Sequence, residues 1–300
     1  MALRTTKRHD EIRGISLCAG VAGLDLGLHI AEPGYRTVCY VERNSFAAST
    51  LVARMADTSL GAAPVWDDLK TFDGRPWRGR VHLVTAGYPC QPFTLSGHRK
   101  GEDDPRHLWP DVARTVDEVA PERVFFENVP GHLSLGFRDV CRDLQDMGYR
   151  VAARVVSAAE VDGSHTRERL FILGYANVSD GRQPGVPDHR AGGDGVQKGP
   201  QPSGVADRVG EPGQDMVPVL GPRHGDGMEG DILPTFPPLP SDIAQWRETL
   251  RRHPDLKPCL HRLDHGLAHR VDRSAAAGNG VVPLAAAHAW VALNGALNGC

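Results

Sequence analysis

The sequence lacks long apolar runs, a leading apolar segment and clustered cysteines. No stretch reaches the ~18 uncharged apolar residues that a membrane-spanning helix requires. The segment from Met1 to Gly14 carries charged side chains where a secretory signal has an apolar core. Six cysteines lie far apart, without a Cys-x-x-Cys pair, in a chain of 300 residues that is too large to need disulfides. We therefore expect a cytoplasmic protein with reduced thiols and no membrane partner.

The chain also lacks a dominant charge. Its 34 Lys and Arg residues against 37 Asp and Glu residues give a formal net charge of −3. Bulk electrostatics therefore do not favour nucleic-acid binding, and any DNA contact must come from local patches. The composition, 40% hydrophobic and 24% charged, is typical of an ordinary globular chain.

A repeated pattern runs from Gly14 to Tyr175: a short apolar run, a turn and then a longer amphipathic stretch. This alternation is typical of the strands and helices of a parallel α/β sheet. The predicted strands are Gly14–Cys18, Thr37–Val41, Val81–Ala86, Arg123–Glu127, Arg150–Val156 and Leu170–Tyr175. The predicted helices are Leu24–Ala31, Ser45–Met55, Trp109–Ala120 and Phe137–Met147. Functional residues of such sheets gather at the carboxyl ends of the strands.

The composition changes between Asn177 and Pro240, where 13 Gly and 11 Pro occur in 64 residues. That share exceeds the roughly 25–30% that marks weakly ordered sequence, and few side chains there could build a core. We predict a long flexible insertion. Helical patterns resume at Ser241–Arg252, with Ser241 or Asp242 as N-cap, and at Pro283–Leu293.

The first strand-to-helix turn contains two glycines, in Ser16-Leu17-Cys18-Ala19-Gly20-Val21-Ala22-Gly23-Leu24-Asp25. Such a turn lets a ligand approach backbone N–H groups closely. Glu42 ends the next strand, where an acid can accept hydrogen bonds from ribose hydroxyls. Asp67 and Asp68 follow, where a carboxylate could hold an adenine amino group. Singly, these residues are typical of turns and solvated acids, so their order carries the prediction.

Two later strand ends carry reactive side chains. Cys90 lies in Gly87-Tyr88-Pro89-Cys90-Gln91, and Glu127 begins Glu127-Asn128-Val129. A lone cysteine usually only packs, but a thiol and an acid on neighbouring strand ends can be a nucleophile and its proton-handling partner. Arg167 and Arg169 precede the last strand, and side chains at i and i+2 point the same way in extended backbone.

In chain order, these segments resemble the motif set of the DNA (cytosine-5) methyltransferases. The motifs are Leu-Cys-Ala-Gly-Val-Ala-Gly-Leu, Val-Glu, Asp-Asp-Leu, Gly-Tyr-Pro-Cys-Gln, Glu-Asn-Val, Arg-Glu-Arg and a final Gly-Asn-Gly-Val-Val-Pro. The resemblance covers Ile15 to Tyr175 and Gly266 to Trp290. It implies a Rossmann-like α/β sheet of the S-adenosylmethionine-dependent methyltransferase type in 1–175. It further implies a small, irregular target-recognition region in 176–265 and a C-terminal segment, 266–300, that returns to the catalytic domain.

The resemblance implies methyl transfer from S-adenosylmethionine to C5 of cytosine in double-stranded DNA. Cys90 would add to C6, which turns C5 into an enamine carbon. Glu127 would protonate or hydrogen-bond N3, and Arg167 and Arg169 would stabilise O2 and the thiolate. Because C6 is inaccessible in a stacked duplex, the target base would be flipped out.

The same resemblance assigns the remaining site residues. Residues expected to hold the cofactor are Cys18, Ala19, Gly20, Gly23, Leu24, Glu42, Asp68, Leu69, Gly87, Pro89, Asn279 and Val281. Residues expected to contact DNA or the target base are Gln91, Ser96, Arg99, Arg106 and Asn128, the first four in a segment that matches the family's mobile catalytic loop. The chain departs from the family pattern at Cys18, which replaces an aromatic residue, and at Ala22, which replaces a glycine. Ser164-His165-Thr166 also stands in place of the usual Pro-Gln-x before Arg-Glu-Arg, and Arg262–Arg273 matches the family's penultimate helical segment only loosely.

Several alternatives remain open at this point. The same chemistry could act on a cytosine of tRNA, or the chain could be an inactive module that binds DNA or the cofactor. A metal site is conceivable at Cys259, His261, His265 and His269, but Gly266 and loose spacing favour solvated histidines, and we predict no metal. We expect a monomer, with a cognate restriction endonuclease as a functional counterpart rather than a physical partner.

Overall fold

The computed structural model describes residues 11–89, 108–163, 166–177, 219–220, 243–252 and 280–298. Its strands are β1 (Ile12–Leu17), β2 (Tyr35–Val41), β3 (Val65–Trp66), β4 (Leu83–Ala86), β5 (Arg123–Asn128), β6 (Tyr149–Ser157), β7 (Glu168–Ala176) and β8 (Val219–Leu220). Its α-helices are α1 (Gly23–Ala31), α2 (Ser45–Ala56), α3 (Trp109–Val119), α4 (Phe137–Asp146), α5 (Ile243–Arg252) and α7 (Pro283–Asn298). Short 3-10 helices are η1 (Leu69–Thr71), η2 (Arg75–Trp77), η4 (Pro130–Ser134) and η5 (Ala158–Val161).

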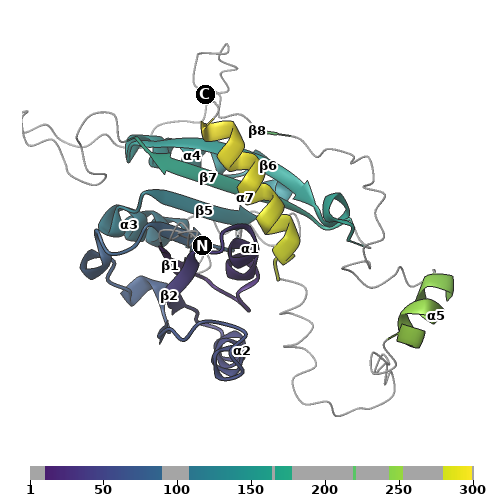
Figure 1. Cartoon of the computed structure of the whole chain (residues 1–300). Helices are drawn as coiled ribbons and strands as arrows, with labels where there is room; N and C mark the ends of the chain where they lie inside the picture. Colours follow the sequence, from purple (N-terminus) through teal and green to yellow (C-terminus); the bar gives the residue numbers. More distant parts are fainter. Residues whose placement is uncertain are drawn as a thin grey trace, which may run out of the picture.

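The strands form one sheet in the order β3-β2-β1-β4-β5-β7-β6-β8, which confirms the predicted Rossmann-like α/β class (Figure 1). The pairs among β3, β2, β1, β4 and β5 are parallel. The parallel arrangement that the alternation predicts does not extend to β7, which is antiparallel to both β5 and β6. A parallel return needs a crossover of about a dozen residues or more, whereas β6 and β7 are joined by the short link 158–167.

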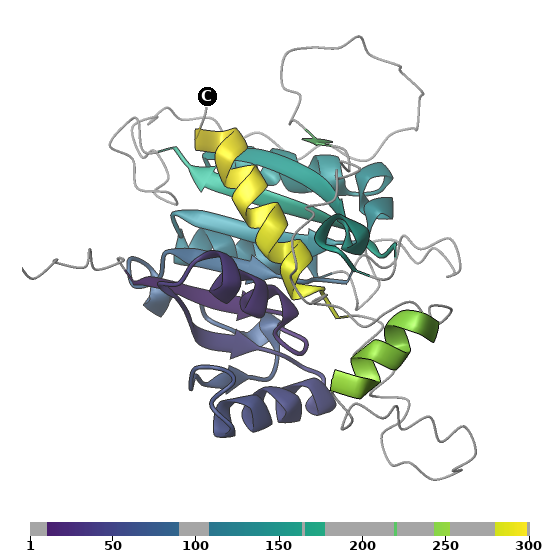
Figure 2. The ribbon, with the colours of Figure 1, turned by 45° about the vertical axis from the view of Figure 1, so that its right-hand side comes forward.

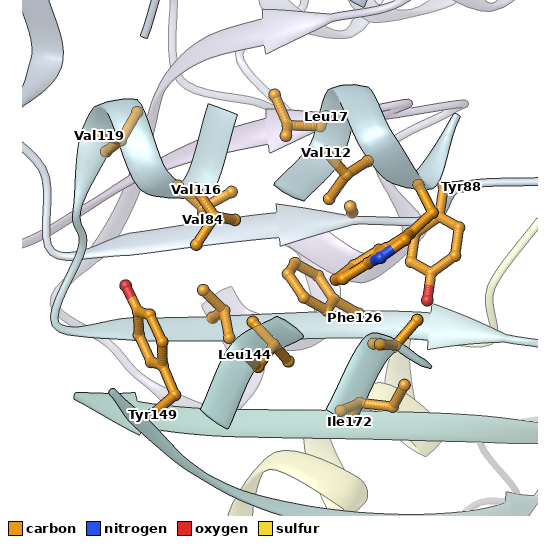
Figure 3. Packing of buried hydrophobic residues seen from close by; sticks show 14 of the residues in the cluster. Leu17, Val84, Tyr88, Val112, Val116, Val119, Phe126, Leu144, Tyr149 and Ile172 are labelled. Atoms are coloured by element: carbon orange, nitrogen blue, oxygen red, sulfur yellow. The ribbon is translucent and has the colours of Figure 1, made fainter. Parts of the chain in front are cut away.

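Two apolar layers cover the sheet, one on each face. Successive strand residues point to opposite faces, so Phe126 packs with residues of α3 and α4, while Phe125 packs with residues of α1 and α7. Figure 3 shows the first layer, where Val112 and Val116 of α3 and Leu144 of α4 lie against the sheet. The sheet is thereby buried on both faces, which explains its nearly continuous apolar strands.

Helix α7, the last described element of the chain, packs beside helix α1, so elements far apart in the sequence lie together on one face of the sheet (Figure 2). A Cβ placed on Gly27 of α1 would lie 2.6 Å from the carbonyl oxygen of Pro283 and 2.6 Å from Cβ of Ala286. The indole N–H of Trp290 donates to Glu32 at 3.0 Å. Helix α7 extends five residues beyond the predicted end at Leu293, to Asn298. Among the described residues, no helix has the length and apolarity that crossing a membrane requires.

Candidate active site

The carboxyl ends of β1, β2, β4 and β5 meet at one edge of the sheet. In the register of these strands Leu17 pairs with Val41 and Ala86, and Ala86 pairs with Phe126. The loops that follow them therefore leave the sheet side by side. Most of the described residues that the sequence assigned to catalysis or cofactor binding lie at this edge.

The turn after β1 has an unusual backbone. Cys18, Gly20 and Ala22 all have left-handed φ angles, of 49°, 55° and 65°. That conformation is readily adopted by glycine and costs other residues roughly 1–2 kcal/mol each. The turn is held in this shape by Glu42, whose carboxylate accepts the N–H of Gly20 at 2.7 Å and the N–H of Asn44 at 2.6 Å. Glu42 therefore ties the turn to β2, a role the sequence did not predict.

Cys18 lies within this turn but is not set up as a nucleophile. Burial, together with the nearby carboxylates of Glu42 and Asp111, raises the pKa of its thiol to about 12. A thiol with that pKa stays protonated at neutral pH, and the thiolate is the reactive form.

The segment before α7 covers the same turn. A Cβ on Gly23 would lie 2.6 Å from the carbonyl oxygen of Val281, so the backbones of α1 and this segment are in direct contact. The structure thus brings Val281 beside Gly23, while Leu24 is buried in the layer between α1 and α7. Both glycine positions in α1 are needed for this close approach.

Asp68 and Leu69 occupy different environments. Asp68 caps η1, with its carboxylate accepting the N–H of Lys70 at 3.0 Å. Leu69, predicted to touch the cofactor, is 4% exposed and packs in the core beneath α3. Its side chain is therefore a packing residue, because the short η1 helix turns it inward.

Glu127, at the end of β5, forms an ion pair with Arg169 of β7. The guanidinium Nε of Arg169 lies 2.7 Å from Oε1 of Glu127. The register explains the contact: Glu127 pairs with Phe171, and Arg169 is the diagonal neighbour on the same face. Because the strands are antiparallel, the beginning of β7 reaches the carboxyl edge of β5.

The protonation of Glu127 reflects opposing effects. Burial raises the pKa of its carboxyl to about 7, although the positive charges of Arg169 and Arg167 lower it. Desolvation wins because the residue is only 7% exposed. The carboxyl group can thus hold or release a proton near neutral pH, which suits a group that exchanges a proton with a substrate.

Asn128 is buried next to Glu127 and binds the protein at both ends of its amide. Its Nδ2 donates to the carbonyl oxygen of Tyr88 at 3.2 Å, and its Oδ1 accepts the N–H of Val129 at 2.9 Å. It therefore joins the ends of β4 and β5, and its contact with the substrate stays a prediction.

Tyr88 adds a second link between these strand ends. Its hydroxyl lies 3.1 Å from Nε2 of His132 in η4. The other ring nitrogen of His132 is 2.9 Å from the carbonyl oxygen of Leu135, which can only accept. Nδ1 therefore carries the proton, and Nε2 accepts from Tyr88. Sequence reasoning missed this pair, because a tyrosine and a histidine in separate loops look like ordinary core residues.

Gly87 lies between the turn after β1 and the carboxyl group of Glu127. Its N–H donates to the carbonyl oxygen of Leu17 at 3.3 Å. A Cβ on Gly87 would lie 3.6 Å from the carbonyl oxygen of Cys18 and 3.6 Å from Oε2 of Glu127. The glycine turn and the carboxyl group of Glu127 therefore face a common space beside Gly87. Pro89, two residues further on, is exposed.

Several predicted residues lie outside the described part of the chain. They are Cys90, Gln91, Ser96, Arg99, Arg106 and Asn279, together with Cys259, His261, His265 and His269 of the metal alternative. Most of the predicted target-recognition region does so too. Within the described ranges, no group of three or more His, Cys, Asp or Glu side chains is arranged to hold a metal ion.

The chain is similar to known methyltransferases. The type II methyltransferase M.PspPI of Psychrobacter sp. (strain TA137) is 33% identical over 169 residues, which are 53% of this chain and 38% of that protein. M.AquIA of Picosynechococcus sp. is 31% identical over 182 residues, which are 55% of this chain and 72% of that protein. The solved structure of the S. pombe Dnmt2 methyltransferase has a TM-score of 0.47 and 24% identity, covering 56% of this chain and 52% of that one.

The match to M.PspPI spans less than half of that relative. A wider match comes from a family model, that of C-5 cytosine-specific DNA methylase, which aligns with residues 12–192. This range takes in more than half of the chain and includes the turn after β1, Glu42, Gly87, Glu127 and Arg169. The chain belongs to the C-5 cytosine-specific DNA methylase family.

Proposed function

We propose that this protein transfers a methyl group from S-adenosylmethionine to C5 of cytosine in double-stranded DNA, through a covalent bond between Cys90 and C6. The observation that carries the proposal is the environment of the carboxyl group of Glu127. Its pKa is about 7, and it pairs with Arg169. It also lies beside Gly87, on the side of that residue away from the glycine turn. Family membership supports DNA as the substrate class.

The turn after β1 fits the proposed cofactor. A Cβ on Gly20 would meet no atom of the described part of the chain within 4 Å, so the backbone there is open to a ligand. The carboxylates of Glu42 and Asp68 each accept backbone N–H groups but keep further lone pairs for hydroxyl or amino groups. Val281 would cover the turn from the side of α7. When bound, S-adenosylmethionine supplies an electrophilic methyl group.

Cys90 directly follows Pro89 and would act as the nucleophile. Its thiolate would form a bond to C6 of the flipped cytosine, the electrons of the C5–C6 double bond would form a C4–C5 double bond, and those of the C4–N3 double bond would pass to N3. Protonated Glu127 would donate to N3, while Arg169 and Arg167 would stabilise negative charge at O2. The electrons of the C4–C5 double bond would take the methyl group from the sulfonium, whose S–CH3 bond breaks to leave S-adenosylhomocysteine. Loss of the C5 proton to water would then restore the C5–C6 double bond and expel the thiolate of Cys90.

The Glu127–Arg169 pair supports this role for a physical reason. A carboxyl group that donates to N3 must be protonated, and an exposed glutamic acid is almost fully ionised at pH 7. Burial keeps a proton available on Glu127, while the arginines prevent the pKa from rising far beyond neutrality. The site can therefore supply the proton at the first step and take it back at the last.

Covalent trapping tests the proposal. Duplexes with 5-fluorocytosine at many sequence positions are incubated with the protein and S-adenosylmethionine, and denaturing gels detect the adduct. Fluorine at C5 cannot leave as a proton does, so the covalent species should accumulate with the wild type and not with Cys90→Ser. Trapping on RNA alone would instead assign the chemistry to RNA. A folded protein that binds the cofactor but traps neither substrate would contradict the proposed activity and favour a binding module.

A further inference from the structure

Gly87 occupies a position where neither packing nor backbone conformation requires glycine. Among the described residues, a Cβ there would meet only the carbonyl oxygen of Cys18 and Oε2 of Glu127, both at 3.6 Å, which is an ordinary van der Waals distance. The φ angle of Gly87 is not in the left-handed region. Alanine would therefore fit this backbone without strain. Gly23 and Gly27 differ, because a Cβ on either would lie 2.6 Å from another backbone atom.

The space beside Gly87 lies between two functional groups. On one side is the carbonyl of Cys18, in the turn assigned above to the cofactor. On the other side is Oε2 of Glu127; the other carboxylate oxygen, Oε1, pairs with Arg169. A side chain at position 87 would thus project between the groups that contact the methyl donor and the target base.

We propose that Gly87 is a positioning residue whose missing side chain keeps open the space in which the methyl donor meets C5 of the cytosine. This inference rests on the proposed function. Methyl transfer requires the donor carbon and C5 to approach to about 3–3.5 Å, and a misplacement of about 1 Å can lower a rate about 100-fold. A methyl group on residue 87 occupies part of the space that this approach needs.

The proposal predicts opposite effects on activity and on stability. Replacing glycine by alanine at an unstrained position reduces the freedom of the unfolded chain, so the melting temperature of Gly87→Ala should stay unchanged or rise by about 1–3 °C. The rate of methyl transfer should nevertheless fall about 100-fold, and further in Gly87→Val. Because the turn and Glu42 are untouched, cofactor affinity should change less than the rate.

Gly295 provides a matched control. It lies on the exposed side of α7, and a Cβ there would meet no atom of the residues that the structure describes within 4 Å. Gly295→Ala should also keep or raise the melting temperature, because alanine favours the helix, but should leave methyl transfer unchanged. The comparison separates a general effect of removing a glycine from an effect at the site.

The experiment measures three quantities for the wild type, Gly87→Ala, Gly87→Val and Gly295→Ala. They are the single-turnover rate with tritium-labelled S-adenosylmethionine and duplex DNA, the cofactor Kd by calorimetry, and the melting temperature. A large rate loss with a near-normal Kd and melting temperature in Gly87→Ala supports the proposal. Wild-type rates in Gly87→Ala, or a melting temperature lowered by several degrees, would overturn it while leaving the proposed function intact. A folded wild type that methylates no DNA would overturn both, and that failure is recognised without any variant.

Discussion

The buried carboxyl of Glu127 predicts a specific pH dependence of stability. Its pKa rises from 4.5 in the unfolded chain to about 7 in the folded protein, mainly because of burial. The folded state therefore binds this proton more tightly than the unfolded state. Stability from this group is fully present below pH 4.5 and is lost as the pH rises through 7.

The size of the effect follows from the shift. About 2.5 pKa units at 1.36 kcal/mol each correspond to about 3 kcal/mol, of which about 2–3 kcal/mol is lost between pH 5 and pH 8.5. Glutamine resembles the protonated carboxyl group in shape but does not titrate. Relative to the wild type, Glu127→Gln should therefore gain about 2–3 kcal/mol of unfolding free energy over this pH range.

Urea unfolding of both proteins at pH 5 and pH 8.5 measures this change. Any constant cost of the substitution, such as the weakened contact with Arg169, cancels when the two pH values are compared. Glu168→Gln is the control: its carboxylate is exposed at the start of β7, next to Arg169, so its difference from the wild type should stay within about 0.5 kcal/mol. A Glu127→Gln difference that is equal at both pH values would refute the raised pKa, and a change of opposite sign would mean that the arginines outweigh burial.

Three further predictions concern activity and packing. Arg169→Ala removes a charge that lowers the pKa of Glu127, so the alkaline limb of the kcat/KM profile for DNA methylation should move to higher pH; a shift to lower pH would contradict this assignment. Gly27→Ala should cost about 1–3 kcal/mol in urea unfolding, because its Cβ would overlap the segment that begins α7, whereas Gly295→Ala should cost nothing. Tyr88→Phe should cost about 1–2 kcal/mol in the same assay, since it removes the hydroxyl that binds a buried histidine; an unchanged midpoint would show that this link is dispensable.

Strand β5 shows what the sequence pattern predicts about a buried strand and what it does not. The run Arg123–Glu127 was predicted as a strand, and β5 spans Arg123–Asn128. Its apolar residues are continuous because both faces are covered, so the sequence indicates burial but not which layer each residue joins. That Phe125 lies toward α7 and Phe126 toward α3 depends on helices that are distant in the sequence.

The direction of β7 illustrates a second limit. The apolar run Leu170–Tyr175 predicts a strand with either orientation. The short link after β6 and the free edge beside β5 make it antiparallel to both neighbours. This orientation is what brings Arg169 to the carboxyl end of β5, so the ion pair with Glu127 follows from topology rather than from spacing.

The sequence by itself determined the alternation of strands and helices, the order of the motifs and the types of reactive side chains, because these depend on local periodicity and on residue chemistry. Tertiary structure alone decided which groups share an environment. Burial among distant elements sets the pKa of Glu127, Glu42 holds the turn at Gly20, Leu69 packs in the core, and Asn128 joins the ends of β4 and β5. These properties depend on solvent exclusion and on contacts between residues far apart in the chain, and no local pattern encodes either.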